Sequence, residues 1–214
     1  MPHTSTTFAP SELVLLHGAR FAGPASLTQG KEELLAGGSV GANSLAESLL
    51  AVTLLAMEDA GAIRLVHEAR KTLFGLMTKK SVAVEATGAG PAFPAGTLEA
   101  ELLATIRKGR AEVGDVIYEW MGTDHKWPRA VVLEQVRNGL VGRGLVHRQE
   151  KRTLKIIVTH TDTLPDSTRQ LLDAHPPAPL LALIDAARAR DDLFPTLEKR
   201  IRAGLNLRQE SDND

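Results

Sequence analysis

The chain has 214 residues, 43% of them hydrophobic and 24% charged, which is typical of folded proteins and unlike disordered or fibrous chains. Its 25 basic and 26 acidic side chains give a net charge of -1 at pH 7, so binding to nucleic acid or to an anionic membrane requires a local basic patch. The absence of cysteine excludes disulfides, thiolate metal sites and thiol nucleophiles, and with them zinc fingers and cysteine proteases.

Residues 1–10 contain neither the basic region nor the apolar region of a secretory signal peptide, so we expect a cytoplasmic protein. The most apolar stretch, residues 45–57, includes Glu47 and is shorter than the roughly 20 residues that span a bilayer. Any membrane contact is therefore expected to be peripheral. We expect one domain over residues 11–207, flanked by flexible tails at 1–10 and 208–214.

The first quarter of the chain predicts one long helix. The apolar run 11–16 is ambiguous, and the stretch 18–30, rich in Gly, Ala and Pro, is expected to be a loop. Ser44 and Glu47 form a capping-box pattern, in which each side chain satisfies the backbone amide of the other residue. We therefore expect a helix over residues 45–59.

A change of pattern after Gly61 predicts a small β-structure. β-prone residues alternate with charged ones at 62–68, and similar residues recur at 81–85, so these segments are expected to pair as strands. Residues 87–96 contain three glycines and two prolines and are expected to be a loop.

Apolar residues then recur at intervals of three and four, which predicts helices. The predicted helices cover residues 97–107, 113–121, 128–141, 165–173, 180–193 and 195–207. Two β-type runs, 145–149 and 153–159, are separated by the charged residues 150–152 and predict a β-hairpin. The expected fold is therefore mainly α, with one hairpin and one small strand pair.

No pattern in the sequence predicts a catalytic or metal site. The seven histidines include no pair at the three- or four-residue spacing that places two imidazoles on one helix face. The glycine-rich stretches lack the Lys-Ser/Thr of a phosphate-binding loop, and the adjacent acids at 32–33 and 191–192 point in different directions on a helix. We therefore expect no metal, no cofactor and no enzymatic activity.

Basic residues gather around the predicted helix 128–141 and the hairpin that follows it. Arg129 and Arg137 lie on the helix, and Lys151 and Arg152 lie in the predicted turn. They form either a local cationic surface or a solvated helix face with a charged turn. A helix followed by a hairpin is also typical of winged-helix DNA-binding modules, although the neutral charge of the chain argues against nucleic acid as a partner.

The order of several motifs carries a resemblance to a known family. The sequence reads LVGRGLV at 140–146, QEKRTL at 149–154 and THTDTL at 159–164. Further segments agree in order at 12–16, at 61–65 with 78–82, and at 180–184 running to 193. Together they span about residues 11–205 and resemble the Golgi phosphoprotein 3 family of phosphoinositide-binding adaptors, of which this chain looks like a bacterial-type member.

The resemblance implies a single, mainly α-helical domain in which amphipathic helices surround a central hydrophobic helix, here residues 45–57. It also implies a hairpin, here residues 146–158, that serves self-association and membrane contact through its apolar residues Leu154, Ile156 and Ile157. We accordingly expect a homo-oligomer formed through the hairpin. The sequence does not indicate which client protein an adaptor of this kind would bind.

Family members that bind phosphatidylinositol 4-phosphate use a tryptophan after the first apolar segment and arginines from two helices, whose guanidinium groups match phosphate oxygens. This chain has no tryptophan between residues 16 and 46, and the arginines of the later helix align with Ala130 and Leu133. The arginine of the first helix aligns with Leu50 or Ala46, depending on the placement of a one-turn insertion. The head-group residues of the family are therefore not retained.

The leading hypothesis is a peripheral-membrane adaptor that binds an anionic phospholipid head group through a basic patch beside the apolar hairpin. Arg129 and Arg137 would substitute for the missing arginines in a shifted register, and Lys151 and Arg152 would complete the patch. Two alternatives stay open: an oligomeric interaction scaffold that does not bind lipid, and a winged-helix DNA-binding protein.

Overall fold

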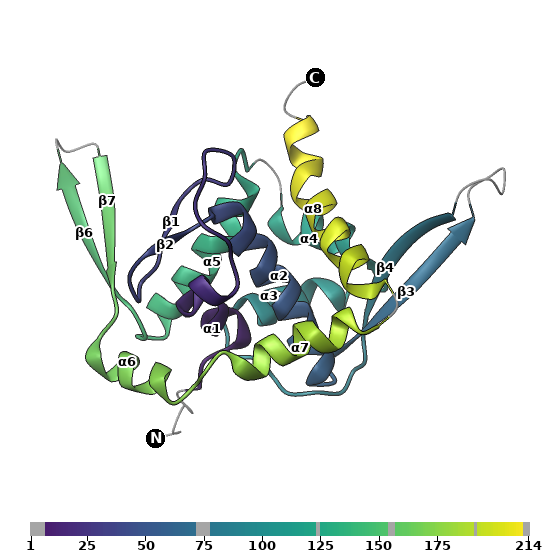
Figure 1. Ribbon diagram of the computed structural model, residues 1–214, viewed down its shortest axis with the longest axis horizontal. Helices are drawn as coiled ribbons and strands as arrows, with labels where there is room; N and C mark the ends of the chain where they lie inside the picture. Colours follow the sequence, from purple (N-terminus) through teal and green to yellow (C-terminus); the bar gives the residue numbers. More distant parts are fainter. Residues whose placement is uncertain (1–6, 72–77, 123–124, 154–156, 191, 212–214) are drawn as a thin grey trace.

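The computed structural model describes residues 7–71, 78–122, 125–153, 157–190 and 192–211, and it is mainly α-helical with short antiparallel sheets, as predicted (Figure 1). The helices are α1 (Pro10–Leu16), α2 (Ala42–Asp59), α3 (Leu98–Ile106), α4 (Val113–Met121), α5 (Pro128–Gly142), α6 (Asp166–Asp173), α7 (Ala178–Arg188) and α8 (Leu193–Ser211). The strands are β1 (Glu32–Glu33), β2 (Ser39–Val40), β3 (Ile63–Lys71), β4 (Thr78–Ala86), β5 (Ala111–Glu112), β6 (His147–Thr153) and β7 (Ile157–Thr163).

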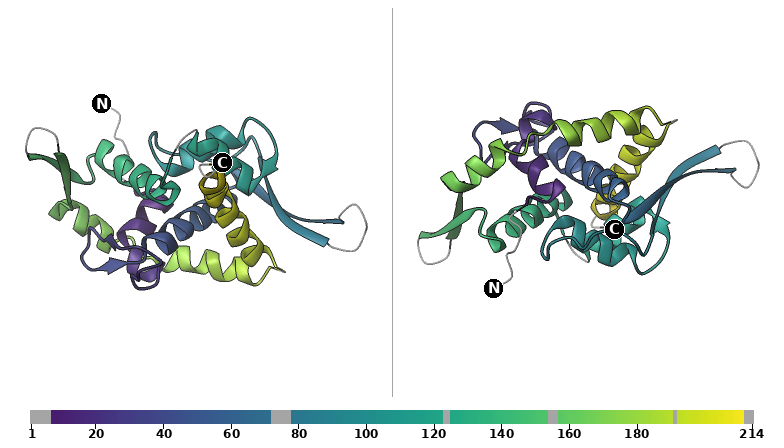
Figure 2. Two further views of the ribbon diagram at one scale, coloured as in Figure 1. Left: turned by 90° about the horizontal axis from the view of Figure 1, so that it is seen from above. Right: turned by 90° about the horizontal axis from the view of Figure 1, so that it is seen from below.

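The sheets are built from strands close together in the sequence. β1 pairs with β2, β4 pairs with both β3 and β5, and β6 pairs with β7, in every case antiparallel. The long hairpins β3–β4 and β6–β7 project at opposite ends of the longest axis, with helices between them (Figures 1 and 2). The molecule therefore has two hairpin ends joined by a helical body.

Helix α2 is buried on most of its faces. Leu45, Leu49, Leu54 and Met57 are each at most 1% exposed, although they do not lie on a single stripe of the helix. Helices α1, α5, α7 and α8 all pack against α2. So wide an apolar surface on one helix is stable in water only when other helices cover it in this way.

The predicted start of this helix is wrong. α2 begins at Ala42 with Gly41 as its N-cap, and Ser44 Oγ donates to the Gly41 carbonyl oxygen (3.1 Å). Glu47 closes no capping box, because two arginines distant in the sequence bind its carboxylate. Tertiary ion pairs thus outweigh the local capping pattern.

The hairpin after α5 is confirmed, but its turn is not where the sequence predicts. Residues 150–152, expected to form the turn, lie within β6 opposite residues 158–160 of β7. Charged residues are compatible with these strands because the hairpin projects from the body (Figure 1) and a two-stranded sheet can face water. The charge cluster was therefore a misleading turn signal.

The ends of the domain also differ from the prediction. Phe8 and Ala9 are buried and Pro10 begins α1, so residues 8–10 belong to the packed domain rather than to a flexible tail. At the other end, α8 continues past Leu207 to Ser211. The ambiguous run 11–16 is helical, and Val14, Leu15 and Leu16 pack into the core.

Helix α8 crosses α4 at two glycines. A Cβ on Gly204 would lie 2.6 Å from the Gly114 carbonyl oxygen, and one on Gly114 would lie 3.1 Å from the Arg200 carbonyl oxygen. A side chain at this crossing would force the two helices apart, because protein interiors have little spare volume. The close approach fixes the course of α8, whose last turns carry Asn206 to a pocket.

Candidate functional site

A pocket of about 490 Å³ opens at the N-terminal end of α5. Its polar lining residues are Lys31, Glu32, Asn43, Arg129 and Asn206, which come from four separate parts of the chain. The apolar lining includes Trp127, Ala130 and Leu133. This volume lies in the usual range of small-molecule sites, so the pocket can hold a small polar ligand.

Trp127 stands at the rim of this pocket. It is the N-cap residue of α5 and precedes Pro128, whose fixed φ suits the first position of a helix. The residue is 66% exposed, and Lys126 Nζ lies 5.8 Å from its ring centroid. Trp127 also lines a second, shallow pocket on the outer face of α5. A large aromatic ring left in water beside a cation is a feature of binding surfaces.

Arg129 brings positive charge to the pocket. Its Nη2 donates to Glu47 Oε1 (3.0 Å) and to Asn206 Oδ1 (3.1 Å). The second oxygen of Glu47 accepts from Arg202 Nε (2.9 Å), a contact that raises the pKa of Arg202. Glu198, 3.9 Å from Arg202 and partly exposed, offsets that guanidinium only weakly. Two guanidinium groups therefore share the Glu47 carboxylate, which leaves excess positive charge beside the pocket.

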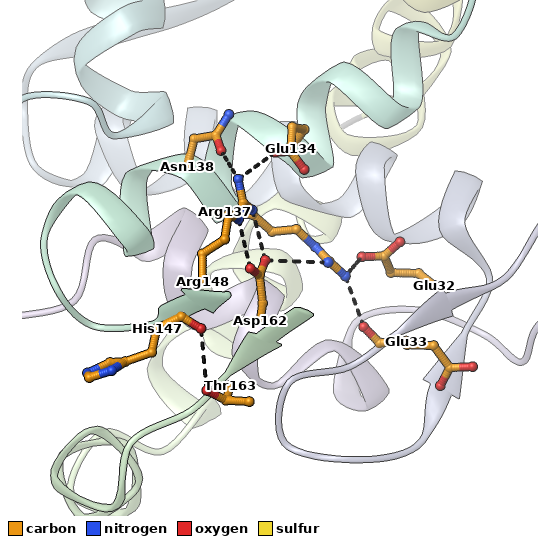
Figure 3. A network of polar contacts seen from close by, with 9 residues as sticks. All are labelled: Glu32, Glu33, Glu134, Arg137, Asn138, His147, Arg148, Asp162 and Thr163. Atoms are coloured by element: carbon orange, nitrogen blue, oxygen red, sulfur yellow. Dashed lines mark hydrogen bonds and ion pairs between the residues drawn. The ribbon is translucent and has the colours of Figure 1, made fainter. Parts of the chain in front are cut away.

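Arg137 fastens β1 to α5 (Figure 3). It donates to the Glu32 carboxylate and to the Glu33 carbonyl oxygen (3.0 Å). The side chains of Arg137 and Glu32 are 22% and 14% exposed. Burial raises the pKa of Glu32, and the charge of Arg137 opposes that rise. The carboxylate that lines the pocket is thus held by a cation of α5.

Asp162 in β7 joins the hairpin to the same network (Figure 3). Its carboxylate accepts from Arg148 Nε (2.7 Å) and Nη2 (2.8 Å), and Arg137 Nη1 lies 3.8 Å away. The paired hydrogen bonds from Arg148 lower the pKa of Asp162. Arg148 also donates to Glu134 (2.9 Å) and Asn138 (2.6 Å) of α5. Charged contacts therefore fix hairpin β6–β7 to α5.

The two arginines of the predicted basic patch are both engaged by acids. Arg129 lies at the pocket with Glu47, and Arg137 lies in the network with Glu32 and Asp162. Sequence reasoning placed them correctly on one helix, but it did not anticipate their carboxylate partners. Of the two, only Arg129 lines the pocket.

The predicted hairpin residues lie largely beyond what the structure describes. Lys151 and Arg152 are in β6, but their side chains are not among the described ones. Leu154 and Ile156 lie outside the described residues, and only the backbone of Ile157, at the start of β7, is described. Their roles in membrane contact and self-association stay predictions.

The positions aligned with the head-group arginines of the resembled family divide into two groups. Ala130 and Leu133 line the pocket. Leu50 and Ala46 are fully buried in α2, where a charged side chain could not be solvated. The pocket thus lies where the later pair of positions lies, but it lacks their cations.

Sequence reasoning missed Trp127, Lys31 and Asn206. A signal for Trp127 was available, because it lies between a polar turn and a helix-initiating proline, a place that is usually open to water. Lys31 and Asn206 gave no such signal, since only the tertiary fold brings β1 and α8 to the start of α5.

A separate group of acids is buried among α1, α3 and α5. Glu99 is fully buried and accepts from the Ser11 backbone nitrogen (2.7 Å) and Oγ (2.8 Å). Glu12, 1% exposed, accepts from the Ala9 backbone nitrogen (2.8 Å) and from Arg143. Burial raises the pKa of both acids. These contacts tie helices together, and we assign them a structural role.

Within the described ranges, no group of three His, Asp or Glu side chains is arranged to hold a metal ion. Among the helices whose placement is described, none is long and apolar enough to cross a membrane. No protein-family model matches the chain, and a search of curated proteins finds no match. Function must therefore be argued from the pocket, its charges and the motifs.

Proposed function

We propose that this chain is a non-enzymatic, peripheral-membrane adaptor that docks on anionic phospholipid, with a head group in the pocket at the start of α5. The observation that carries the proposal is the exposed indole of Trp127 beside that pocket. Tryptophan is enriched at membrane–water interfaces, where its ring contacts the acyl boundary and its N–H meets the polar layer. An aromatic anchor at the mouth of a head-group pocket suits this geometry.

Cations around Trp127 support the same proposal. Lys126 lies over its ring, and Lys31 and Arg129 line the pocket. Lys31 pairs with Glu33 at 2.5 Å, but both side chains are more than 60% exposed, so that pair is weak in water. Each basic residue near an anionic surface contributes roughly 1 kcal/mol, which salt screens. Binding should therefore weaken as salt is raised.

The family resemblance adds to the proposal from a different direction. In the proposed assignment α2 is the central hydrophobic helix, and β6–β7 is the hairpin of membrane contact and self-association. Lys151 and Arg152 in β6, with Leu154, Ile156 and Ile157, would then form a second membrane contact. Recognition of phosphatidylinositol 4-phosphate itself has less support, because Ala130 and Leu133 are apolar.

Liposome flotation tests the proposal. We expect Trp127→Ala to reduce recovery with anionic vesicles by about tenfold, the equivalent of roughly 1.4 kcal/mol. Tyr118→Ala is the matched control, because it removes another exposed aromatic ring, on α4, that does not line the pocket. Equal recovery of both variants, or equal recovery of the unmodified chain with neutral and anionic vesicles, would reject the proposal.

The oligomeric scaffold is the second candidate. In the described sheets, β6 and β7 pair only with each other, so both outer edges of this hairpin are available to a second copy. Light scattering on Ile156→Asp separates the candidates: an oligomer that dissociates while lipid binding persists favours the adaptor. A chain that is monomeric before substitution removes the scaffold.

Nothing in the described part of the chain favours the DNA-binding alternative. The helix that would enter a DNA groove is α5, and it packs against α1, α2 and α8. Arg129, Arg137 and the C-cap residue Arg143 each bind a carboxylate of the protein. A recognition helix needs such side chains directed at phosphates and base edges.

A further inference from the structure

We infer that the pocket at the start of α5 selects a phospholipid head group with a single phosphodiester charge and neutral hydroxyl groups over one that carries an additional phosphate monoester. This inference rests on the proposed function and specifies the ligand class of the same site. It follows from the charges, the amides and the apolar part of the pocket lining.

The charges of the lining suit one negative charge better than several. Lys31 and Arg129 are its cations, and Glu32 is a carboxylate in the same wall. Arg129 is partly neutralised by Glu47, and Lys31 by Glu33. The lining residues by themselves are two cations and one carboxylate, a net charge of at most +1, which a single phosphodiester matches. A phosphate monoester would add roughly two further negative charges at neutral pH without a further cation in the lining.

Glu32 discriminates between a hydroxyl and a phosphate. A carboxylate accepts hydrogen bonds from sugar or glycerol hydroxyls, but it repels a phosphate monoester. Arg137, which also donates to the Glu33 carbonyl oxygen, holds the Glu32 carboxylate in place. The Glu32 side chain is only 14% exposed, so its charge is poorly screened. Arg137 offsets part of the Glu32 charge, and Glu134 and Glu33 act on Glu32 in the opposite direction.

The remaining residues of the lining also favour hydroxyl groups over an added phosphate. Asn43 and Asn206 bring side-chain amides, which hydrogen-bond hydroxyls well and carry no net charge. Ala130 and Leu133 bring only carbon atoms, and a second phosphate against them would lose water without gaining donors. The apolar wall therefore accepts the carbon skeleton of a polyol rather than an added phosphate.

A matched pair of lipids tests the inference on the unmodified chain. Phosphatidylcholine vesicles carry either phosphatidylinositol or phosphatidylinositol 4-phosphate, at contents adjusted to the same surface charge, and a third set carries phosphatidylglycerol. We expect the phosphatidylinositol and phosphatidylglycerol vesicles to capture about fivefold more protein than the phosphatidylinositol 4-phosphate vesicles, the equivalent of roughly 1 kcal/mol.

The outcomes separate the two proposals. Capture by phosphatidylinositol 4-phosphate that equals or exceeds capture by phosphatidylinositol overturns the inference and leaves membrane docking intact. Capture by no anionic vesicle above the phosphatidylcholine background overturns the proposed function itself.

Two variants locate the preference in the pocket. Ala130→Arg supplies a cation to the lining, and we expect it to raise capture by phosphatidylinositol 4-phosphate severalfold relative to phosphatidylinositol. Ala186→Arg, on an exposed position of α7, adds the same charge elsewhere and should leave that ratio unchanged. Glu32→Gln should raise the ratio in the same direction. An unchanged ratio in Ala130→Arg would contradict the inference, whether or not Glu32→Gln folds normally.

Discussion

The two hairpin ends of the molecule are anchored by different forces. At β3–β4, Ile63, Leu65, Val82 and Val84 are at most 3% exposed and insert into the apolar core. At β6–β7, the paired strands are anchored through Asp162, whose side chain is 4% exposed and binds arginine. Apolar burial depends little on pH and salt, whereas ion pairs depend on both. The attachment of β6–β7 should therefore respond more strongly to pH and salt than that of β3–β4.

The pockets at the two ends differ in their charge. The pocket beside β4 and β5 has a volume of about 430 Å³, close to that of the pocket at α5. Its lining includes Glu68, Glu112 and Asp115 against Arg110, which itself pairs with Glu68. An anionic head group would be repelled there. Similar volumes thus carry different chemistry, and charge together with an aromatic rim distinguishes the candidate site.

Removing the buried carboxylate of β7 should have the largest effect on the difference between the two hairpins. Asp162→Asn leaves Arg148 without its bidentate partner in a site of low exposure, at an expected cost of about 3 kcal/mol. Urea unfolding measures the change in the free energy of unfolding of the whole chain. Amide hydrogen exchange should accelerate in β6–β7 while β3–β4 stays protected. Asp173→Asn, on the exposed end of α6, is the control. Equal acceleration in both hairpins would contradict a local anchor.

A change at the α4–α8 crossing should affect both ends together. Gly204→Ala places a methyl group 2.6 Å from the Gly114 carbonyl oxygen, and we expect a loss of about 2 kcal/mol in the free energy of unfolding. Gly142→Ala, at the end of α5 with open space around its Cβ position, should be neutral or slightly stabilising. Thermal unfolding compares the two, and a stable Gly204→Ala would mean that the helices can separate freely.

Matched arginine substitutions test which of the two pockets binds anionic vesicles. Arg129→Gln should lower affinity for anionic vesicles about tenfold, roughly 1.4 kcal/mol, because it removes the guanidinium at the α5 pocket. Arg110→Gln makes the same change at the β4–β5 pocket and should leave binding unchanged. Loss of binding in both variants would indicate that overall charge, rather than the pocket, governs docking.

The smallest effect should come from the buried acid of α3. Because burial raises the pKa of Glu99, the folded state binds its proton more tightly than the unfolded state, and this group's contribution to stability falls as pH rises above its usual value of 4.5. Glu99→Gln can keep both contacts with Ser11 without a charge, so it should stabilise the protein at neutral pH by up to about 1 kcal/mol.

The pH dependence of stability has the opposite sign at the β6–β7 end. The pKa of Asp162 is lowered by Arg148, so the contribution of Asp162 is present above its usual value of 3.8 and is lost as pH falls further. Unfolding measured across the acid range in Glu99→Gln and in the unmodified chain separates the two groups. An identical pH dependence in both proteins would contradict the assignment to Glu99.

Periodicity was sufficient to predict most helices, because α3, α4 and α5 each bury a recurrent apolar face. Gly122 ends α4 as predicted, at a positive φ of 67° that few other residues adopt. The strand pair β3–β4 also followed from its alternating β-prone residues. These features depend on neighbours along the chain, which a sequence displays directly.

The charged residues could not be predicted in the same way. Glu47 was interpreted as a capping residue and Arg129 as a surface cation, yet they bind each other across 82 positions of sequence. Arg137 and Glu32 are likewise distant in sequence and adjacent in the fold. A long side chain can reach many partners, so its partner is decided by the packing of whole helices rather than by local pattern. The lining of the candidate site comes from four segments, so local pattern could not predict it.

The contacts of helix α8 at both ends of the molecule depend on its rotation about its own axis. Arg200 pairs with Glu112 at the β4–β5 end, while Arg202 and Asn206 meet Glu47 and Arg129 at the α5 end. A slip of one residue along this helix would rotate every side chain by roughly 100° and would undo both sets of contacts at once. An insertion or deletion in its first turns should therefore be tolerated far less than one after Asn206.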